Sequence, residues 1–191
     1  MLERLLLNSP WLAMVLGVSV FALEHYTAVY EAYLYQSGVK DFIGYDGLYR
    51  LTPEYQAVIS RRRLISGRVL AILGVLAVGV YGAWWGLTQQ LDRPDVFLLL
   101  MGGLLLNELA EISRQYRQIM FFREVRRRGG LQGRSLLTRQ LGVMRHVFDL
   151  YAFVMLYLVL FLLTSSWFLL GGAVACFVSS RRLRDWAVIK A

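Results

Sequence analysis

The stretch "LLLNELAEISRQYR", residues 104–117, joins an apolar run to a charged one within a few positions. The uncharged run that ends in it, Val96 to Asn107, holds 12 residues. A helix of that length rises about 18 Å, whereas the hydrocarbon core of a bilayer is about 30 Å thick. To cross a membrane, the helix has to continue through Glu108 and Glu111. We therefore expect these two carboxylates to lie in or near the bilayer.

The composition of the chain agrees with a lipid environment. Of the 191 residues, 57% are hydrophobic and 18% are charged, whereas soluble domains carry about 25% charged residues. The single cysteine, Cys176, lies inside an apolar run, so we expect neither a disulfide framework nor a cysteine-rich metal site. The apolar run near the N-terminus has no small-residue cleavage site after it, and we expect it to remain as the first span.

Four charge-free stretches mark the candidate spans: residues 5–23, 69–91, 96–107 and 150–180. The first runs on past Glu24 and Glu31 with no Gly or Pro before Gly38, so its helix should continue through both glutamates. The last stretch, of 31 residues, is too long for one straight crossing. We predict that it forms a short hairpin turning at Thr164 to Ser166.

This pattern predicts an all-α, polytopic transmembrane helix bundle in a single domain over residues 1–191. Five spans are expected, and four spans with one long tilted last helix are the alternative. Segment 36–68 holds six basic residues and segment 112–148 holds nine, whereas the N-terminus holds only Arg4 before the first span. By the positive-inside rule the basic linkers and the C-terminus are cytoplasmic and the N-terminus is outside. We expect an integral protein of a bacterial inner membrane.

A shift of 86 positions aligns residues 12–92 with residues 98–178 and gives 13 identities. A leucine-rich chain inflates this number, so duplication and chance stay open. A duplication would make two parallel two-helix repeats, related by an axis along the membrane normal.

Charged residues at membrane depth are the candidate functional residues, because such groups usually face a partner, a cavity or an ion path. The acidic set is Glu24, Glu31, Glu108 and Glu111, supported by His25, Asn107, Gln115 and Tyr116. Arginines that begin the return helices could neutralise these glutamates in buried ion pairs; they are Arg61, Arg62, Arg63 and Arg145. Ion pairing and a proton or cation path are both open interpretations.

The second basic linker is the most cationic stretch of the chain. We expect its arginines to contact anionic lipid headgroups on the cytoplasmic side, or a partner; they are Arg123, Arg126, Arg127, Arg128 and Arg134. No nucleic-acid-binding module is recognisable, and the spacings of a carboxylate-bridged metal site are absent. No catalytic motif or cofactor signature is found either.

Three functions remain after these exclusions. The first is an oligomeric membrane protein for proton or cation passage, or ion-coupled transport, that uses the intramembrane glutamates. The alternative is a non-catalytic accessory or scaffold subunit of a membrane complex, with the glycine-rich second span as a docking face, since Gly82 and Gly86 have the small-xxx-small spacing of helix contacts in lipid. The third is a lipid-handling membrane enzyme. A homo- or hetero-oligomer is expected.

Overall fold

The computed structural model describes residues 2–45, 67–129, 135–137 and 139–189. Arg61, Arg62, Arg63 and Arg134 lie outside the described residues. The described part is all-α except for two three-residue strands. Its elements are α1 (Leu2–Asn8), α2 (Pro10–Gln36), the 3₁₀ turn η1 (Val39–Asp41), β1 (Ile43–Tyr45), α4 (Gly67–Trp84), the π-helical turn η2 (Trp85–Gln90), α5 (Pro94–Arg127), β2 (Ser135–Leu137), α6 (Arg139–Thr164) and α7 (Trp167–Ile189).

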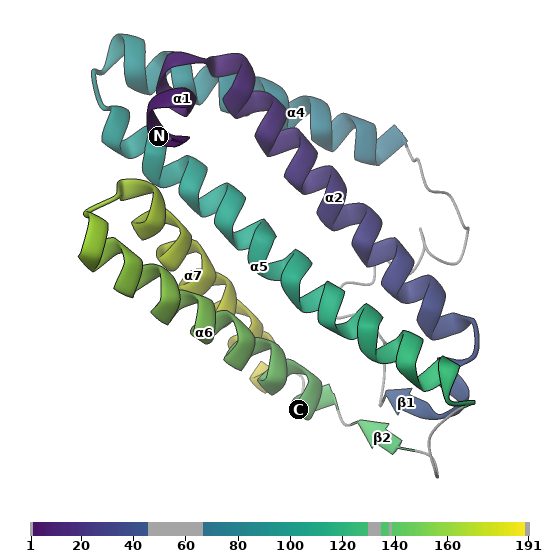
Figure 1. Cartoon of the computed structure of the whole chain (residues 1–191). Coiled ribbons are helices and arrows are strands. Elements are labelled where there is room, and N and C mark those ends of the chain that lie inside the picture. The colour runs from purple at the N-terminus through teal and green to yellow at the C-terminus, as the bar shows by residue number, and fades with distance from the viewer. Residues whose placement is uncertain (1, 46–66, 130–134, 138, 190–191) are drawn as a thin grey trace.

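The long helices lie side by side, with α5 in the centre (Figure 1). Helix α2 packs along α5 in the same direction, and α4 returns along the far side of α2. On the opposite side of α5 lies the antiparallel pair α6 and α7, of which α7 makes the extensive contact with α5. The central position of α5 brings its side chains within reach of three other helices.

Helix α5 is continuous over 34 residues, or about 51 Å. The prediction that it runs through Glu108 and Glu111 is confirmed. Helix α2 likewise continues through Glu24 and Glu31 to Gln36. The first span differs at its start: it begins at Pro10, and residues 5–8 belong to the separate helix α1. Pro10 has no N–H to donate within a helix, and the Ser9 side chain accepts a hydrogen bond from the backbone N–H of Leu12, which caps the start of α2.

The predicted turn in the last apolar stretch is confirmed. Helix α6 ends at Thr164, Ser165 has a φ of +53°, and α7 begins at Trp167. The Ser166 hydroxyl accepts a hydrogen bond from the backbone N–H of Leu169 at 3.3 Å, which caps α7. The alternative of one long last helix is therefore wrong, because the left-handed backbone at Ser165 interrupts it.

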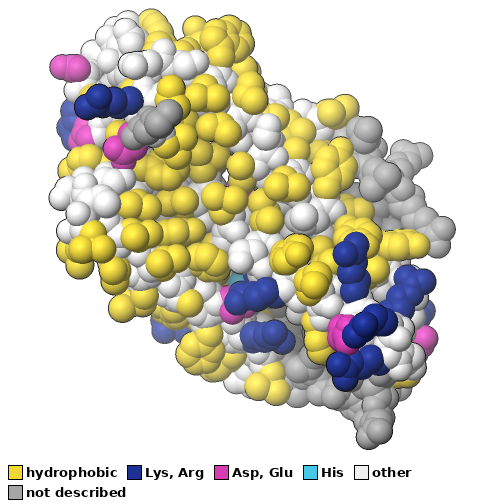
Figure 2. Space-filling model, viewed as in Figure 1, with side chains coloured by type: hydrophobic (Ala, Val, Ile, Leu, Met, Phe, Trp, Pro, Cys, Tyr) yellow, Lys and Arg dark blue, Asp and Glu magenta, His cyan; other side chains and the backbone are white. Residues whose placement is uncertain are grey.

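Among the described residues, four helical segments are long and apolar enough to cross a membrane: Pro10–Gln36, Gly67–Gln90, Pro94–Arg127 and Gln140–Thr164. Their outward surfaces carry large apolar side chains, including Val75, Val78 and Leu162, which are 73–77% exposed. Figure 2 shows apolar side chains over much of one face, with Lys and Arg gathered at one end and spread over the opposite half. Such an apolar surface fits an integral membrane protein. A fifth crossing by α7 stays a prediction.

Two paired glycines set the distance between α5 and α7. A Cβ added to Gly102 would come within 2.8 Å of the Cα of Phe168, and one added to Gly171 within 2.7 Å of the carbonyl carbon of Leu99. Only residues without a Cβ fit at these two positions, so the backbones of α5 and α7 approach as closely as in other small-residue helix contacts.

Strands β1 and β2 pair in parallel, with Ile43 opposite Ser135 and Gly44 opposite Leu136. Among the described residues the order helix, strand, helix occurs twice, in α2–β1–α4 and in α5–β2–α6. The strand pairs are 92 positions apart, whereas the alignment of the two halves uses a shift of 86. The internal duplication stays a prediction.

Candidate functional site

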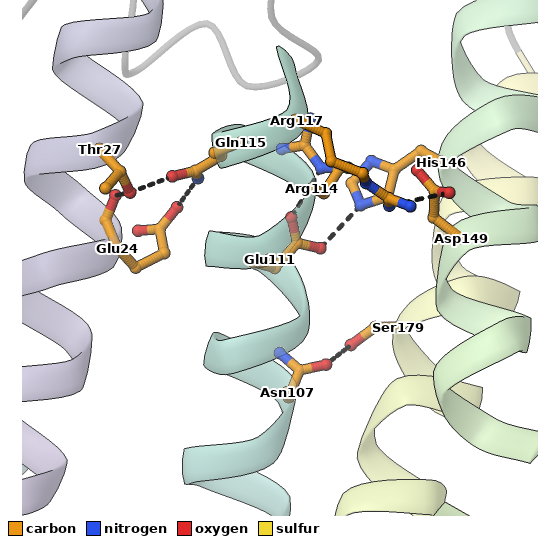
Figure 3. A network of polar contacts seen from close by, with 10 residues as sticks. All are labelled: Glu24, Thr27, Asn107, Glu111, Arg114, Gln115, Arg117, His146, Asp149 and Ser179. Carbon is orange, nitrogen blue, oxygen red and sulfur yellow. Dashed lines mark hydrogen bonds and ion pairs between the residues drawn. The ribbon is translucent and has the colours of Figure 1, made fainter. Parts of the chain in front are cut away.

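Polar side chains of α5 between residues 107 and 117 connect this helix to three neighbours (Figure 3). Asn107, Glu111 and Arg114 recur at i, i+4 and i+7 and so share one face of the helix. Gln115 lies on another face, towards α2. The charged end of the quoted stretch is thus a set of contacts between helices.

Glu111 joins α5 to α6. Its Oε1 lies 2.7 Å from His146 Nε2, and its Oε2 accepts a hydrogen bond from Arg114 Nε at 3.0 Å. The side chains of Glu111 and His146 are 18% and 14% exposed. Both carboxylate oxygens therefore have a partner, as a charged group in a poorly solvated place requires.

A second ion pair between α5 and α6 lies nearby. Arg117 Nη2 is 2.9 Å from Asp149 Oδ1. Arg145, which the sequence offered as a partner for the glutamates, has an exposed side chain and makes no ion pair with another described residue. Its neighbour His146 contacts Glu111 instead.

Gln115 joins α5 to α2. Its side chain is 1% exposed. The amide nitrogen donates to Glu24 Oε1, and the amide oxygen accepts from the Thr27 hydroxyl. A buried amide that both donates and accepts in this way fixes two helices in one register.

The two remaining glutamates differ in their surroundings. Glu108 is half-buried on α5 beside Asn107, with Glu24 and Glu111 as its nearest like charges. Glu31 is buried on α2, at 4% exposure. Three of the four predicted carboxylates, Glu24, Glu108 and Glu111, therefore lie at a similar level of the bundle, and Glu31 lies two turns further along α2.

Asn107 joins α5 to α7, since its Oδ1 accepts a hydrogen bond from the Ser179 hydroxyl at 3.0 Å. We name the contacts of Asn107, Glu111, Gln115 and Arg117 with the neighbouring helices the polar layer. The layer spans a short part of α5, from residue 107 to residue 117, about 15 Å along the helix. Towards the start of α5 it is followed by an apolar cluster that includes Phe97, Met101 and Leu105.

The arginines at the end of α5 differ in their partners. Arg127 and Arg128 both donate to Glu124, at 2.9 Å and 2.7 Å. Arg123 donates instead to the Tyr30 hydroxyl of α2, from Nη2 at 2.7 Å and from Nε at 3.3 Å. Arg126 is exposed.

Sequence reasoning located the acidic residues but missed most of the residues that contact the polar side chains of α5. These missed residues lie 32 to 88 positions along the chain from their partners on α5; they are Thr27, His146, Asp149 and Ser179. The sequence shows which polar residues lie within otherwise apolar helices. It does not show which of these residues contact one another.

The arrangement holds four helices together at one level. Among the described residues, no three of His, Cys, Asp and Glu gather closely enough to bind a metal ion. Comparison with known protein families, with curated proteins and with solved structures finds no match to the chain.

Proposed function

We propose that the chain is a non-catalytic scaffold or accessory subunit of a membrane complex, and that one face of α4 is its docking surface. This α4 face consists of Gly74, Val78 and Gly82, and the spacing of four residues continues to Gly86 at the start of η2. The observation that carries the proposal is the contrast between two sets of glycines. A Cβ added to Gly74, Gly82 or Gly86 would meet no atom of the described residues within 4 Å.

The glycines of α5 and α7 are used within the chain, where they bring two backbones together. The glycines of α4 lie on an outward face in which Val78 is 74% exposed. Small residues in a stripe permit close approach of another membrane helix, and association in lipid depends on such packing and not on the hydrophobic effect. The α4 face therefore suits a helix of another subunit.

The direction of the contacts in the polar layer also supports a scaffold role. Its contacts run across the bundle, from α2 through α5 to α6 and α7, and not along the direction of the helices. The carboxylate of Glu111 has direct partners on both oxygens. Such a layer fixes the mutual positions of the helices, which is what a subunit needs to present a rigid docking face.

Native mass spectrometry of the chain, extracted from its membrane in mild detergent, tests this proposal. We expect a mass above the 21.9 kDa of one chain. Gly82→Ile should reduce the share of the complex, because a branched side chain holds the partner helix away from the α4 face. Ala152→Ile is the matched control, since Ala152 is a small exposed residue of α6, and it should leave the complex intact.

A lone monomer from the unchanged chain would contradict the scaffold proposal. Equal loss of the complex in Gly82→Ile and Ala152→Ile would contradict the assignment of the docking surface to α4.

Proton or cation passage is the second candidate, and one observation favours it. Glu108 is close enough to Glu24 and Glu111 for their charges to interact. Carboxylates that share a site bind a cation or a proton to relieve their repulsion. An ion path would have to continue past the apolar cluster of Phe97, Met101 and Leu105, either between subunits or through a rearranged bundle.

Flux measurements on reconstituted protein separate the two candidates. Ion passage predicts a flux that the double substitution Glu108→Gln, Glu111→Gln reduces. A scaffold predicts no flux in either protein. An unchanged flux in the double variant would exclude a role of these two carboxylates in ion passage.

A further inference from the structure

Arg123 is held differently from its neighbours around the end of α5. Arg117 pairs with Asp149, Arg127 and Arg128 share Glu124, and Arg126 is exposed with no ion pair among the described residues. Arg123 makes no ion pair with any carboxylate among the described residues. It is held by an uncharged group, the Tyr30 hydroxyl, and its guanidinium carbon lies 5.4 Å from the centroid of the Tyr30 ring.

This contact orients the guanidinium without neutralising it. The bonds to Tyr30 use Nε and Nη2. Arginine has five N–H donors in a planar fork, so the donors on Nη1 remain available for an anion. Held in this way, Arg123 keeps its full positive charge and has already lost part of its conformational freedom, which favours binding of a phosphate group.

Exposed apolar and aromatic side chains extend from Arg123 along both helices. On α5, Tyr116 and Met120 precede Arg123 at i−7 and i−3 and are 59% and 48% exposed. On α2, Tyr26 precedes Tyr30 by one turn and is 44% exposed. Because α2 and α5 run in the same direction, the exposed side chains of both helices lie on the same side of the Arg123–Tyr30 contact, towards the middle of the bundle (Figure 1).

We propose that Arg123 and Tyr30 bind the phosphate of an anionic phospholipid, whose acyl chains lie along Tyr26, Tyr116 and Met120. A cation at the polar end of an exposed apolar and aromatic surface matches both parts of such a lipid, and tyrosine is typical of this depth in a membrane. The site lies on α2 and α5 and so does not depend on the docking role of α4.

Lipid retention by the purified full chain tests the site. Protein in mild detergent is mixed with phosphatidylglycerol or phosphatidylcholine, and bound lipid is counted by native mass spectrometry. We expect phosphatidylglycerol to be retained in preference to phosphatidylcholine, and Arg123→Gln to lower its retention about fivefold. Arg127→Gln is the matched control: it removes the same positive charge from an arginine that donates to Glu124 and not to Tyr30, and we expect a change of less than about twofold.

Tyr30→Phe gives a second reading, since it keeps the ring and removes the hydroxyl that orients Arg123. We expect it to lower retention of phosphatidylglycerol as well, with the melting temperature of each variant reported beside it. Equal losses in Arg123→Gln and Arg127→Gln would overturn the proposal in favour of diffuse charge attraction. Competition by glycerol 3-phosphate as strong as that by the lipid would overturn it in favour of a site for soluble anions.

Discussion

At the scale of single residues, Glu111 shows how a carboxylate is accommodated on an otherwise apolar helix. One oxygen faces Arg114, one turn along the same helix, and the other faces His146 of α6. The first contact is local and contributes little to tertiary structure, whereas the second connects two helices. We therefore expect the bond to His146 to supply the contribution of Glu111 to the stability of the contact between α5 and α6.

A double-substitution cycle measures this contribution. Glu111→Gln and His146→Gln, alone and together, should give a coupling free energy of about 1 kcal/mol, because helix-to-helix hydrogen bonds in membranes contribute about that much. The free energy of unfolding is obtained from reversible unfolding in mixed micelles. The cycle of Glu124→Gln and Arg127→Gln on the exposed end of α5 should give no measurable coupling, since water solvates both groups. Similar coupling in both cycles would contradict the role given to His146.

The position of Glu111 could be predicted from length alone, because 12 uncharged residues do not cross a bilayer. Its partner could not be. Arg145 and His146 are adjacent in the sequence, and only the rotation of α6 about its axis decides which of them faces α5. The same holds for Gln115, whose contacts with Glu24 and Thr27 depend on the register between α2 and α5.

At the scale of elements, α4, α5 and α7 use glycine differently. Gly102 and Gly171 lie where two backbones meet, and the glycines of α4 face outward. Sequence spacing pointed to Gly82 and Gly86 but did not distinguish a contact inside the chain from an outward face. The helix break before Pro10 likewise could not be predicted, because an uncharged run does not reveal where one helix ends and the next begins.

Alanine substitution of the two kinds of glycine should have opposite effects on the stability of the monomer. Gly102→Ala places a Cβ against the backbone of Phe168 and should destabilise the chain by about 1–3 kcal/mol through overpacking. Gly74→Ala meets open space and should be neutral or stabilising by up to about 1 kcal/mol, because alanine is the better helix former. Unfolding of the monomer in mixed micelles measures both. A loss as large for Gly74→Ala as for Gly102→Ala would show that the α4 face is covered within the chain.

At the scale of the whole molecule, the direction of each helix follows from the contacts. Helices α2, α5 and α7 run one way and α4 and α6 run the other, so the described helices pass five times along the bundle (Figure 1). The described parts of the two connections, β1 and β2, lie together at one end, where they pair in parallel. Helix α7 is not among the four segments apolar enough to span a membrane, and Arg181, Arg182 and Arg184 lie in its second half.

Thiol labelling decides between five crossings and four. Cys176 is the only cysteine, so Cys176→Ser gives a background into which Lys40→Cys, Asp92→Cys and Asp185→Cys are placed one at a time, all three at exposed positions. In intact cells an impermeant reagent should label the variant at position 92 alone, because the positive-inside rule predicts that the connection between α4 and α5 is outside. The variants at 40 and 185 should react only after the membrane is opened, because both lie at the end of the bundle that carries β1 and β2, which the same rule predicts to be cytoplasmic. Opening the membrane without adding reagent is the control for exposure during lysis.

Labelling of the variant at position 185 in intact cells would mean that α7 does not cross and that the chain has four spans. The α5–α7 contact through Gly102 and Gly171 would then not be a contact between two membrane-spanning helices.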